Sequence, residues 1–195
     1  MLMRLFFISS MLFLFGCGSV SEESDKIIDT VHNVVSAEMN LDFKVLLDRY
    51  NDEYKKVVAQ TSDSVYLKDL HSFDSVFLNC VSFTDSLKKE VDKLDKIDPK
   101  SVELIKTIFI KQGVADTLFS KIKTTYELAE SISNLTENKK AIKAARLRIL
   151  NEPNTGQLKN HLFGLNNPPG VSMILYGFEY ELFHMTDKVL INSSE

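Results

Sequence analysis

Two residue pairs in the sequence have the spacing that metal ligands use on a helix. Glu181 and His184 form a Glu-x-x-His motif, and Asp29 and His32 are also three residues apart. In di-iron bundles such pairs point inward together, and two Glu-x-x-His motifs combine with a glutamate from each of two further helices. This sequence has no second Glu-x-x-His motif, and Glu181 lies off the apolar stripe that contains Phe178. We therefore expect no metal site, and expect these pairs to be surface or boundary residues.

No other motif nominates a catalytic or cofactor site. The sequence has no G-x-S-x-G nucleophile elbow, no Walker phosphate loop and no G-x-G-x-x-G dinucleotide motif. It offers no nucleophile, base and orienting group together, so we predict that the protein is not an enzyme and binds no cofactor. The 27 acidic against 23 basic residues, a net charge of −4, argue against nucleic acid as a partner.

Cys17, the first of two cysteines, follows an apolar segment over residues 5–15. That segment is shorter than the roughly 20 residues that span a bilayer, and a basic residue precedes it, as in a signal peptide. Leu14-Phe15-Gly16-Cys17 resembles the lipobox of bacterial lipoproteins, a family in which diacylglycerol is joined to the cysteine thiol. The resemblance implies a signal peptide over residues 1–16, a lipidated Cys17 that begins the mature chain, and a polar tether over residues 17–25. The alternative is an ordinary signal peptide or anchor helix with an incidental cysteine.

A lipid anchor at Cys17 would determine where the protein works. Each buried methylene contributes roughly 0.8 kcal/mol, so two or three acyl chains such as palmitate hold a protein on a membrane almost irreversibly. The acids Glu22, Glu23 and Asp25 are similar to the signals that send some Bacteroidota lipoproteins to the cell surface. We expect a cell-envelope protein, lipid-anchored in the outer membrane on its periplasmic or surface face.

The distribution of glycine and proline predicts helices. Neither residue occurs between Ser19 and Asp98, whereas antiparallel sheets need frequent turn residues. Apolar residues recur every three or four positions, with charged residues between them, over four long stretches: 27–58, 67–94, 102–132 and 171–189. We predict an all-α protein, an up-and-down bundle of four or five long antiparallel helices, with one domain over residues 26–195.

Short polar segments mark where these helices begin and end. Residues 60–64 offer a break and a new N-cap, and Asp98-Pro99 combines a good N-cap with proline at the first helical position. Gly113 marks a kink or a close contact within the third stretch. Residues 139–150 continue as helix, and a loop then leads to the last helix near Asn167. We expect Cys80 to be a buried small hydrophobe, and the core to include Phe73, Phe77, Ile105, Phe109, Ile122, Phe178 and Leu182.

A basic run, KKAIKAARLR, occupies residues 139–148 without any acid. Part of it, Lys139, Lys143 and Arg146, shares one helical face. The run could dock an acidic partner or lipid phosphates, and the alternative is a solvated face. The candidate docking residues are Lys139, Lys140, Lys143, Arg146 and Arg148, and the loop from Phe163 to Pro169 is a second candidate surface.

A tripeptide of Asp, then Ser or Thr, then an aliphatic residue recurs along the chain, more often than the roughly one occurrence that composition would give. It is similar to the O-glycosylation acceptor of exported Bacteroidota proteins. The alternative is amphipathic patterning, because the same tripeptide suits the edge of a helix. The candidate acceptors are Thr30, Ser64, Ser75, Ser86 and Thr117.

The segment LFGLNNPP, residues 162–169, and the helix-like VSMILYGFEYELFHMTDKVL after it resemble the N-terminal periplasmic domain of the GldM (PorM) family of gliding-motility and type IX secretion proteins. Residues 101–135, which end in TTYELAESISNL, are also similar to that domain's long third helix. The resemblance implies a helical scaffold or docking domain in an envelope machine. We therefore expect a non-enzymatic interaction lipoprotein with an envelope protein partner, and an accessory role beside that machinery is one candidate. The alternative is a bundle that houses a small apolar ligand.

Overall fold

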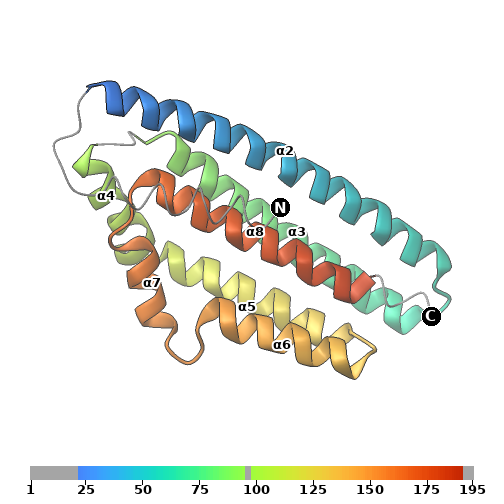
Figure 1. Ribbon diagram of the computed structural model, residues 1–195. Helices are drawn as coiled ribbons and strands as arrows, with labels where there is room; N and C mark the ends of the chain where they lie inside the picture. Colours follow the sequence, from blue (N-terminus) through green and yellow to red (C-terminus); the bar gives the residue numbers. More distant parts are fainter. Residues whose placement is uncertain (1–21, 95–97, 191–195) are drawn as a thin grey trace. The chain divides into compact units, whose positions relative to one another are not determined.

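The computed structural model describes residues 22–94 and 98–190, and every regular element in them is a helix (Figure 1). The prediction of an all-α protein is therefore confirmed for this part of the chain. The elements are α2 (Glu22–Gln60), α3 (Ser64–Asp92), α4 (Pro99–Lys106), the π-helical turn η1 (Thr107–Lys111), α5 (Val114–Ile132), α6 (Thr136–Leu150), α7 (Thr155–Phe163) and α8 (Pro168–Leu190). None of these helices is long and apolar enough to cross a bilayer.

The chain divides into two compact units, residues 1–37 and 38–195. This boundary differs from the predicted start of the domain at residue 26, and α2 already begins at Glu22, inside the predicted tether. The apolar stripe of α2 explains the difference, because Val31 and Val34 are exposed whereas Met39 is buried. An amphipathic pattern predicts a helix, but it does not say where along that helix burial begins.

Within the second unit, α3 packs against both α8 and α5, and α6 packs against α5 and α8 (Figure 1). The part of α2 from Glu38 onward reaches α3 and α8 through long side chains. Its Tyr50 packs on Phe77 of α3 with 4.4 Å between ring centroids, and its Phe43 meets Phe183 of α8 edge to face at 5.7 Å. Aromatic rings therefore join this helix to the rest of the core.

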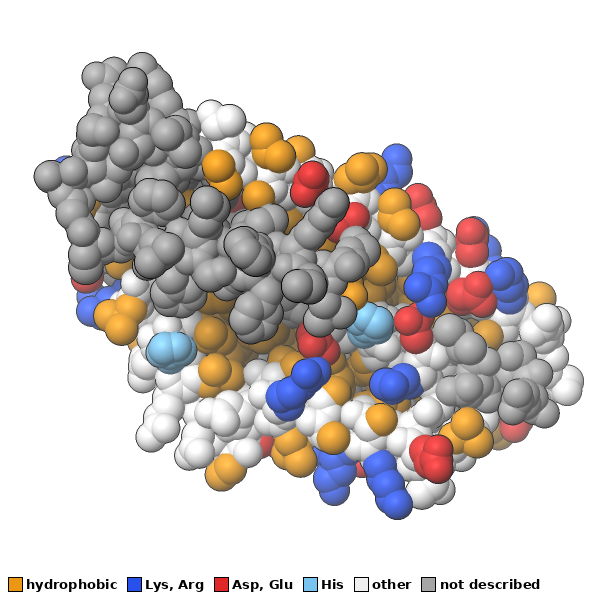
Figure 2. Space-filling model, viewed as in Figure 1, with side chains coloured by type: hydrophobic (Ala, Val, Ile, Leu, Met, Phe, Trp, Pro, Cys, Tyr) orange, Lys and Arg blue, Asp and Glu red, His pale blue; other side chains and the backbone are white. Residues whose placement is uncertain are grey.

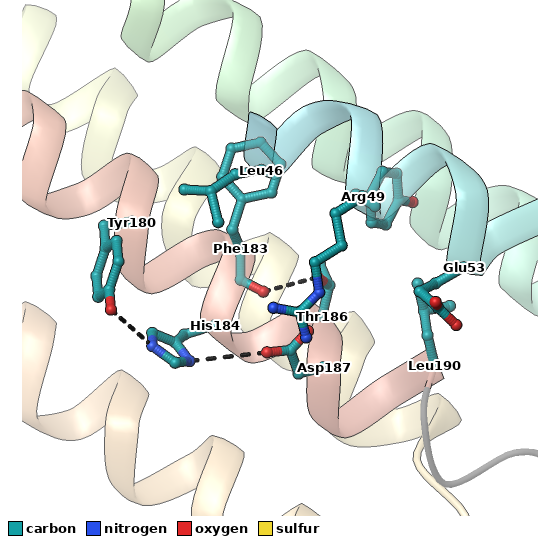
Figure 3. Close-up of a pocket in the computed structure, with 10 residues that line it drawn as sticks. Leu46, Arg49, Glu53, Tyr180, Phe183, His184, Thr186, Asp187 and Leu190 are labelled. Atoms are coloured by element: carbon teal, nitrogen blue, oxygen red, sulfur yellow. Dashed lines mark hydrogen bonds and ion pairs between the residues drawn. The ribbon is translucent and has the colours of Figure 1, made fainter. Parts of the chain in front are cut away.

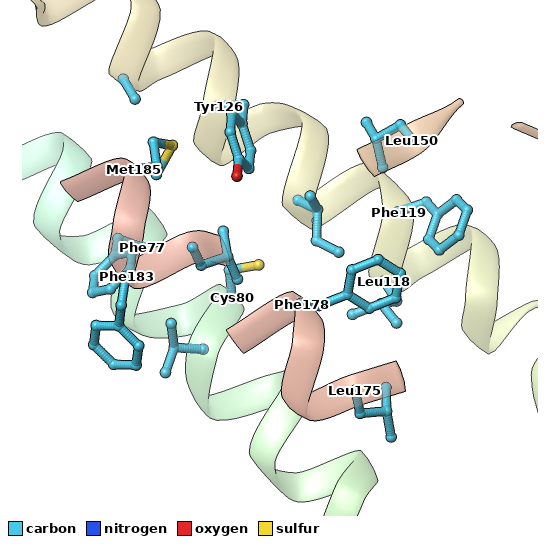
Figure 4. Packing of buried hydrophobic residues seen from close by; sticks show 14 of the residues in the cluster. Phe77, Cys80, Leu118, Phe119, Tyr126, Leu150, Leu175, Phe178, Phe183 and Met185 are labelled. Carbon is cyan, nitrogen blue, oxygen red and sulfur yellow. The ribbon is translucent and has the colours of Figure 1, made fainter. Parts of the chain in front are cut away.

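Aromatic and aliphatic side chains fill the space between the helices (Figure 4). Phe77 and Phe183 meet edge to face at 5.3 Å, and Phe119 and Phe178 do so at 5.7 Å. Aromatic pairs in this geometry add to the free energy of simple area burial. All seven predicted core residues are buried, as is Cys80, so these predictions are confirmed: Phe73, Phe77, Ile105, Phe109, Ile122, Phe178 and Leu182.

The predicted helix starts within residues 60–64 and at Asp98 are confirmed, and the first of these N-caps is Asp63. The Asp63 carboxylate accepts hydrogen bonds from the Val65 and Tyr66 amides, and Asp98 accepts one from the Lys100 amide. Gly113 also interrupts the third stretch as predicted. Its φ of +74° is strained for any residue with a Cβ, and it separates η1 from α5.

The prediction of a loop between α6 and α8 is wrong in part, because this segment contains the helix α7. This nine-residue helix is held by Phe163, whose ring stacks on Phe109 at 4.4 Å and also meets Phe119. A helix of this length covers little more than two turns, too few to establish an apolar periodicity. Its existence depends on tertiary packing rather than on local pattern.

Candidate functional site

The exposed side of α6, together with its N-cap residue Leu135, carries three lysines and two leucines. Lys139, Lys140 and Lys143 are exposed, and none of them forms a hydrogen bond or ion pair through its side chain with another described residue. Leu135 and Leu147 are 46% and 38% exposed. Four of these five residues follow one another at intervals of four, which places them in one row on a helix. We call these five residues the α6 face.

The two arginines of the predicted docking set have other roles. Arg146 is only 12% exposed, and its Nη1 lies 3.3 Å from Glu127 and 3.6 Å from Glu130, both on α5. Arg148 donates two hydrogen bonds to the Glu181 carboxylate of α8, at 3.0 and 3.1 Å. The expectation that Arg146 shares the open face of Lys143 is therefore corrected. Both arginines hold α6 against its neighbours, although the Arg148 side chain is still 68% exposed, and only the three lysines have no acid partner among the described residues.

The second predicted docking surface, residues 163–169, is buried at its two ends and partly exposed between them. Phe163, Pro168 and Pro169 are buried, whereas Leu165 is 82% exposed. The segment thus turns the chain from α7 into α8 and presents a single apolar side chain.

All five candidate glycosylation hydroxyls belong to exposed residues: Thr30, Ser64, Ser75, Ser86 and Thr117. Four of the aspartates that precede them have structural partners. Asp63 caps α3, Asp74 accepts a 2.8 Å hydrogen bond from Tyr50, Asp85 pairs with Lys89 at 2.6 Å, and Asp116 pairs with Lys159. Helix capping and helix–helix pairing therefore account for much of the repeated tripeptide, and glycosylation stays a prediction.

The Glu-x-x-His pair does not converge on one point. Glu181 binds Arg148, whereas the His184 ring lies beside Tyr180 and Asp187. Within the ranges that the structure describes, no three His, Cys, Asp or Glu side chains are grouped as metal ligands would be. The side chains of Asp29 and His32 lie outside the described part.

A pocket of about 170 Å³ lies between α2 and α8 (Figure 3). On its α8 side the Tyr180 hydroxyl lies 3.0 Å from His184 Nε2, and His184 Nδ1 lies 3.8 Å from Asp187. Arg49 of α2 completes the row with a 3.0 Å hydrogen bond to the Asp187 carboxylate. Sequence analysis missed this arrangement, although the i, i+4, i+7 spacing of the three α8 residues could have indicated it.

The polar residues of this pocket join two helices, α2 and α8. Arg49 lines it and pairs with Asp187, and no serine or cysteine lines it as a nucleophile. Its volume is below the roughly 300–1,000 Å³ of typical small-molecule sites. The pocket therefore gives no support to the alternative of a bound apolar ligand.

A buried ion pair lies between α3 and α8. Lys88 Nζ is 2.8 Å from Glu179 and 3.5 Å from Asp85, and Lys88 and Glu179 are both almost fully buried. The ring of Phe43 covers the ammonium group at 5.1 Å. Burial raises the pKa of Glu179 to about 7, against the opposing effect of Lys88. Such a pair fixes how two helices align, because a shift of either helix would leave a buried charge without its partner.

No protein-family model, curated protein or solved structure matches this chain.

Proposed function

We propose that this protein is a non-enzymatic, lipid-anchored interaction module of the bacterial cell envelope. Its long helices form an up-and-down bundle that presents the α6 face to an acidic surface of an envelope protein. The observation that supports this proposal best is the state of the three lysines. They have no acid partner among the described residues, while the arginines of the same run are bound within the chain.

The composition of the α6 face suits a docking surface. Unpaired ammonium groups attract an acidic partner and orient it as it approaches. The exposed parts of Leu135 and Leu147 supply apolar area at both ends of the lysine row, and burying such area favours association.

The lipobox around Cys17 supports the anchor, although Cys17 lies outside the described residues. The similarity of residues 162–190 to the GldM family supports an accessory role beside gliding-motility or type IX secretion machinery. An anchored scaffold needs no catalytic group, which agrees with the structural roles of the polar clusters described for this chain.

Photo-crosslinking in intact cells tests the docking role. A photoreactive residue at position 140 should capture one reproducible envelope protein, and Lys139→Glu with Lys143→Glu should abolish that capture. The matched control is the same residue at position 68, because Lys68 is also an exposed lysine but lies on α3. Identical products from both positions, or capture that survives charge reversal, would contradict the proposal.

A further inference from the structure

Between residues 38 and 60, α2 is joined to the rest of the fold through side chains rather than through close packing of its backbone. The helices whose backbones pack closely on one another, such as α3 with α8 and with α5, do not include α2. Hydrogen bonds between long side chains cross this seam instead: Asp42–Tyr176, Arg49–Asp187, Tyr50–Asp74 and Tyr54–His71. Low packing density of this kind is typical of segments that open while the rest of a protein stays folded.

The seam between α2 and α8 also contains open space. Leu46 and Arg49 of α2 and Tyr180 and Asp187 of α8 line the pocket of about 170 Å³ that lies within it (Figure 3). The pocket is large enough to hold water. Apolar surface that faces water adds nothing to hydrophobic stabilisation, so this part of the seam holds α2 weakly.

The outward side of α2 is exposed to water. Acidic, basic and hydrophobic side chains are mixed along the edge formed by this helix (Figure 2). Lys44, Asp48 and Lys55 are among the exposed residues on this side. Within the described part of the chain, α2 is therefore held by its inward side alone.

A buried ion pair lies beneath this inward side. Phe43 of α2 covers the Lys88 ammonium at 5.1 Å, and Glu179 lies on α8 between Tyr176 and Phe183, which both contact α2. One carboxylate oxygen of Glu179 has no hydrogen-bond partner among the described residues, although Glu179 is only 1% exposed. Desolvation opposes the burial of an ammonium and a carboxylate even when the two are paired. Lifting α2 returns water to both groups, so opening recovers part of that free energy.

We propose that residues 38–60 of α2 form a strap that opens from α3 and α8 about the turn at residues 61–63, while α3 to α8 stay folded. The Asp63 carboxylate caps α3 by itself, so α3 keeps its first turn when α2 moves. Opening uncovers Phe77 and Phe183, together with the ion pair of Lys88. The inference concerns α2 and does not depend on the docking role proposed for the α6 face.

Hydrogen–deuterium exchange of the full chain, read by mass spectrometry of its peptides, tests the inference. After correction for intrinsic rates, residues 38–60 should exchange about tenfold faster or more than α3 and α8, because local opening needs less free energy than global unfolding. Arg49→Ala removes a hydrogen bond across the seam, so it should accelerate exchange in residues 38–60 and leave α3 and α8 unchanged.

A variant without the buried charges separates strap opening from simple fraying of a helix end. Lys88→Met/Glu179→Leu replaces both charges with apolar side chains, so opening no longer recovers their hydration. Exchange in residues 38–60 should slow by about fivefold or more in this variant. The matched control is Lys93→Met/Glu90→Leu, which makes the same change at an exposed ion pair of α3 and should leave exchange in residues 38–60 unchanged.

Residues 38–60 that exchange no faster than α3 and α8 would overturn the inference, because α2 would then open only when the whole protein unfolds. Exchange that is unchanged or faster in a folded Lys88→Met/Glu179→Leu variant would also overturn it; circular dichroism shows whether this variant is folded. If it is not folded, Arg49→Ala decides. Acceleration confined to residues 38–60 supports the strap, whereas acceleration shared with α3 and α8, or none, contradicts it.

Discussion

Glu179 is buried between α3 and α8, with one carboxylate oxygen bonded to Lys88 and the other without a hydrogen-bond partner among the described residues. Burial raises its pKa to about 7 from an ordinary value of 4.5, and the neighbouring Asp85 acts in the same direction. Between these values the folded state keeps a proton that the unfolded state has lost. The contribution of Glu179 to stability is thus fully present below pH 4.5 and is lost as the pH rises through 7.

We predict that Glu179→Gln removes this dependence of the free energy of unfolding on pH between 4.5 and 7. The free energy of unfolding of the wild type should fall relative to the variant by roughly 2–3 kcal/mol between pH 4.5 and 7. Urea denaturation at several pH values measures the difference. The control is Glu90→Gln, because Glu90 pairs with Lys93 on the exposed surface and should leave the profile unchanged. Parallel profiles for wild type and Glu179→Gln would contradict the prediction.

Cys80 should be chemically inert in the folded protein. Burial raises the pKa of its thiol to about 11, and the side chain is almost inaccessible. Since the thiolate is the reactive form, iodoacetamide at neutral pH should label Cys80 only after urea is added. Mass spectrometry of the Cys80 peptide separates its reaction from that of Cys17. Rapid labelling of the native protein would show that this part of the core opens readily.

At the scale of elements, η1 and α7 depend on the stack of Phe109 on Phe163. Phe109→Ala should lower the free energy of unfolding by about 3–5 kcal/mol, since it leaves a cavity at a fully buried site. Thermal or urea denaturation measures this loss. Leu165→Ala is the matched control at an exposed apolar position, and it should change stability by about 0.5 kcal/mol or less. Equal effects of the two variants would contradict the packing described for Phe109.

Arg146 and Lys143 should separate structural from docking roles within α6. Arg146→Ala leaves Glu127, Glu130 and Glu152 without their arginine, so it should destabilise the protein by roughly 1–2 kcal/mol. Lys143→Ala removes an exposed, unpaired charge and should be nearly neutral. Urea denaturation of both variants measures the contrast, and a larger loss for Lys143→Ala would show that the assignment of roles is wrong.

The same elements show how far sequence reasoning reaches. The spacing of apolar residues over α3, α5 and α8 is long enough to define helices and a core, so Phe77 and Leu182 could be predicted. Pattern alone could not predict α7, because it is short and depends on Phe163 meeting a distant ring. Pattern alone also could not predict that Arg146 has a structural role. Its side chain pairs with acids on α5, and only the folded chain brings these acids close to it.

At the scale of the whole molecule, the proposed anchor and the proposed docking role depend on one another. A module that is held at a membrane by its N-terminal end can keep a weak docking face, because confinement raises the effective concentration of its partners. The α6 face fits that role, with three unpaired lysines and little apolar area.

The central claim is therefore the lipid anchor, and mass spectrometry of the N-terminal peptide tests it most directly. Protein extracted from membranes of its native host should begin at Cys17, carry diacylglycerol on the thiol and an acyl chain on the amine, and lack residues 1–16. Cys17→Ser should prevent this processing. A peptide that spans residue 17 with residues 1–16 still attached and an unmodified thiol would contradict the account.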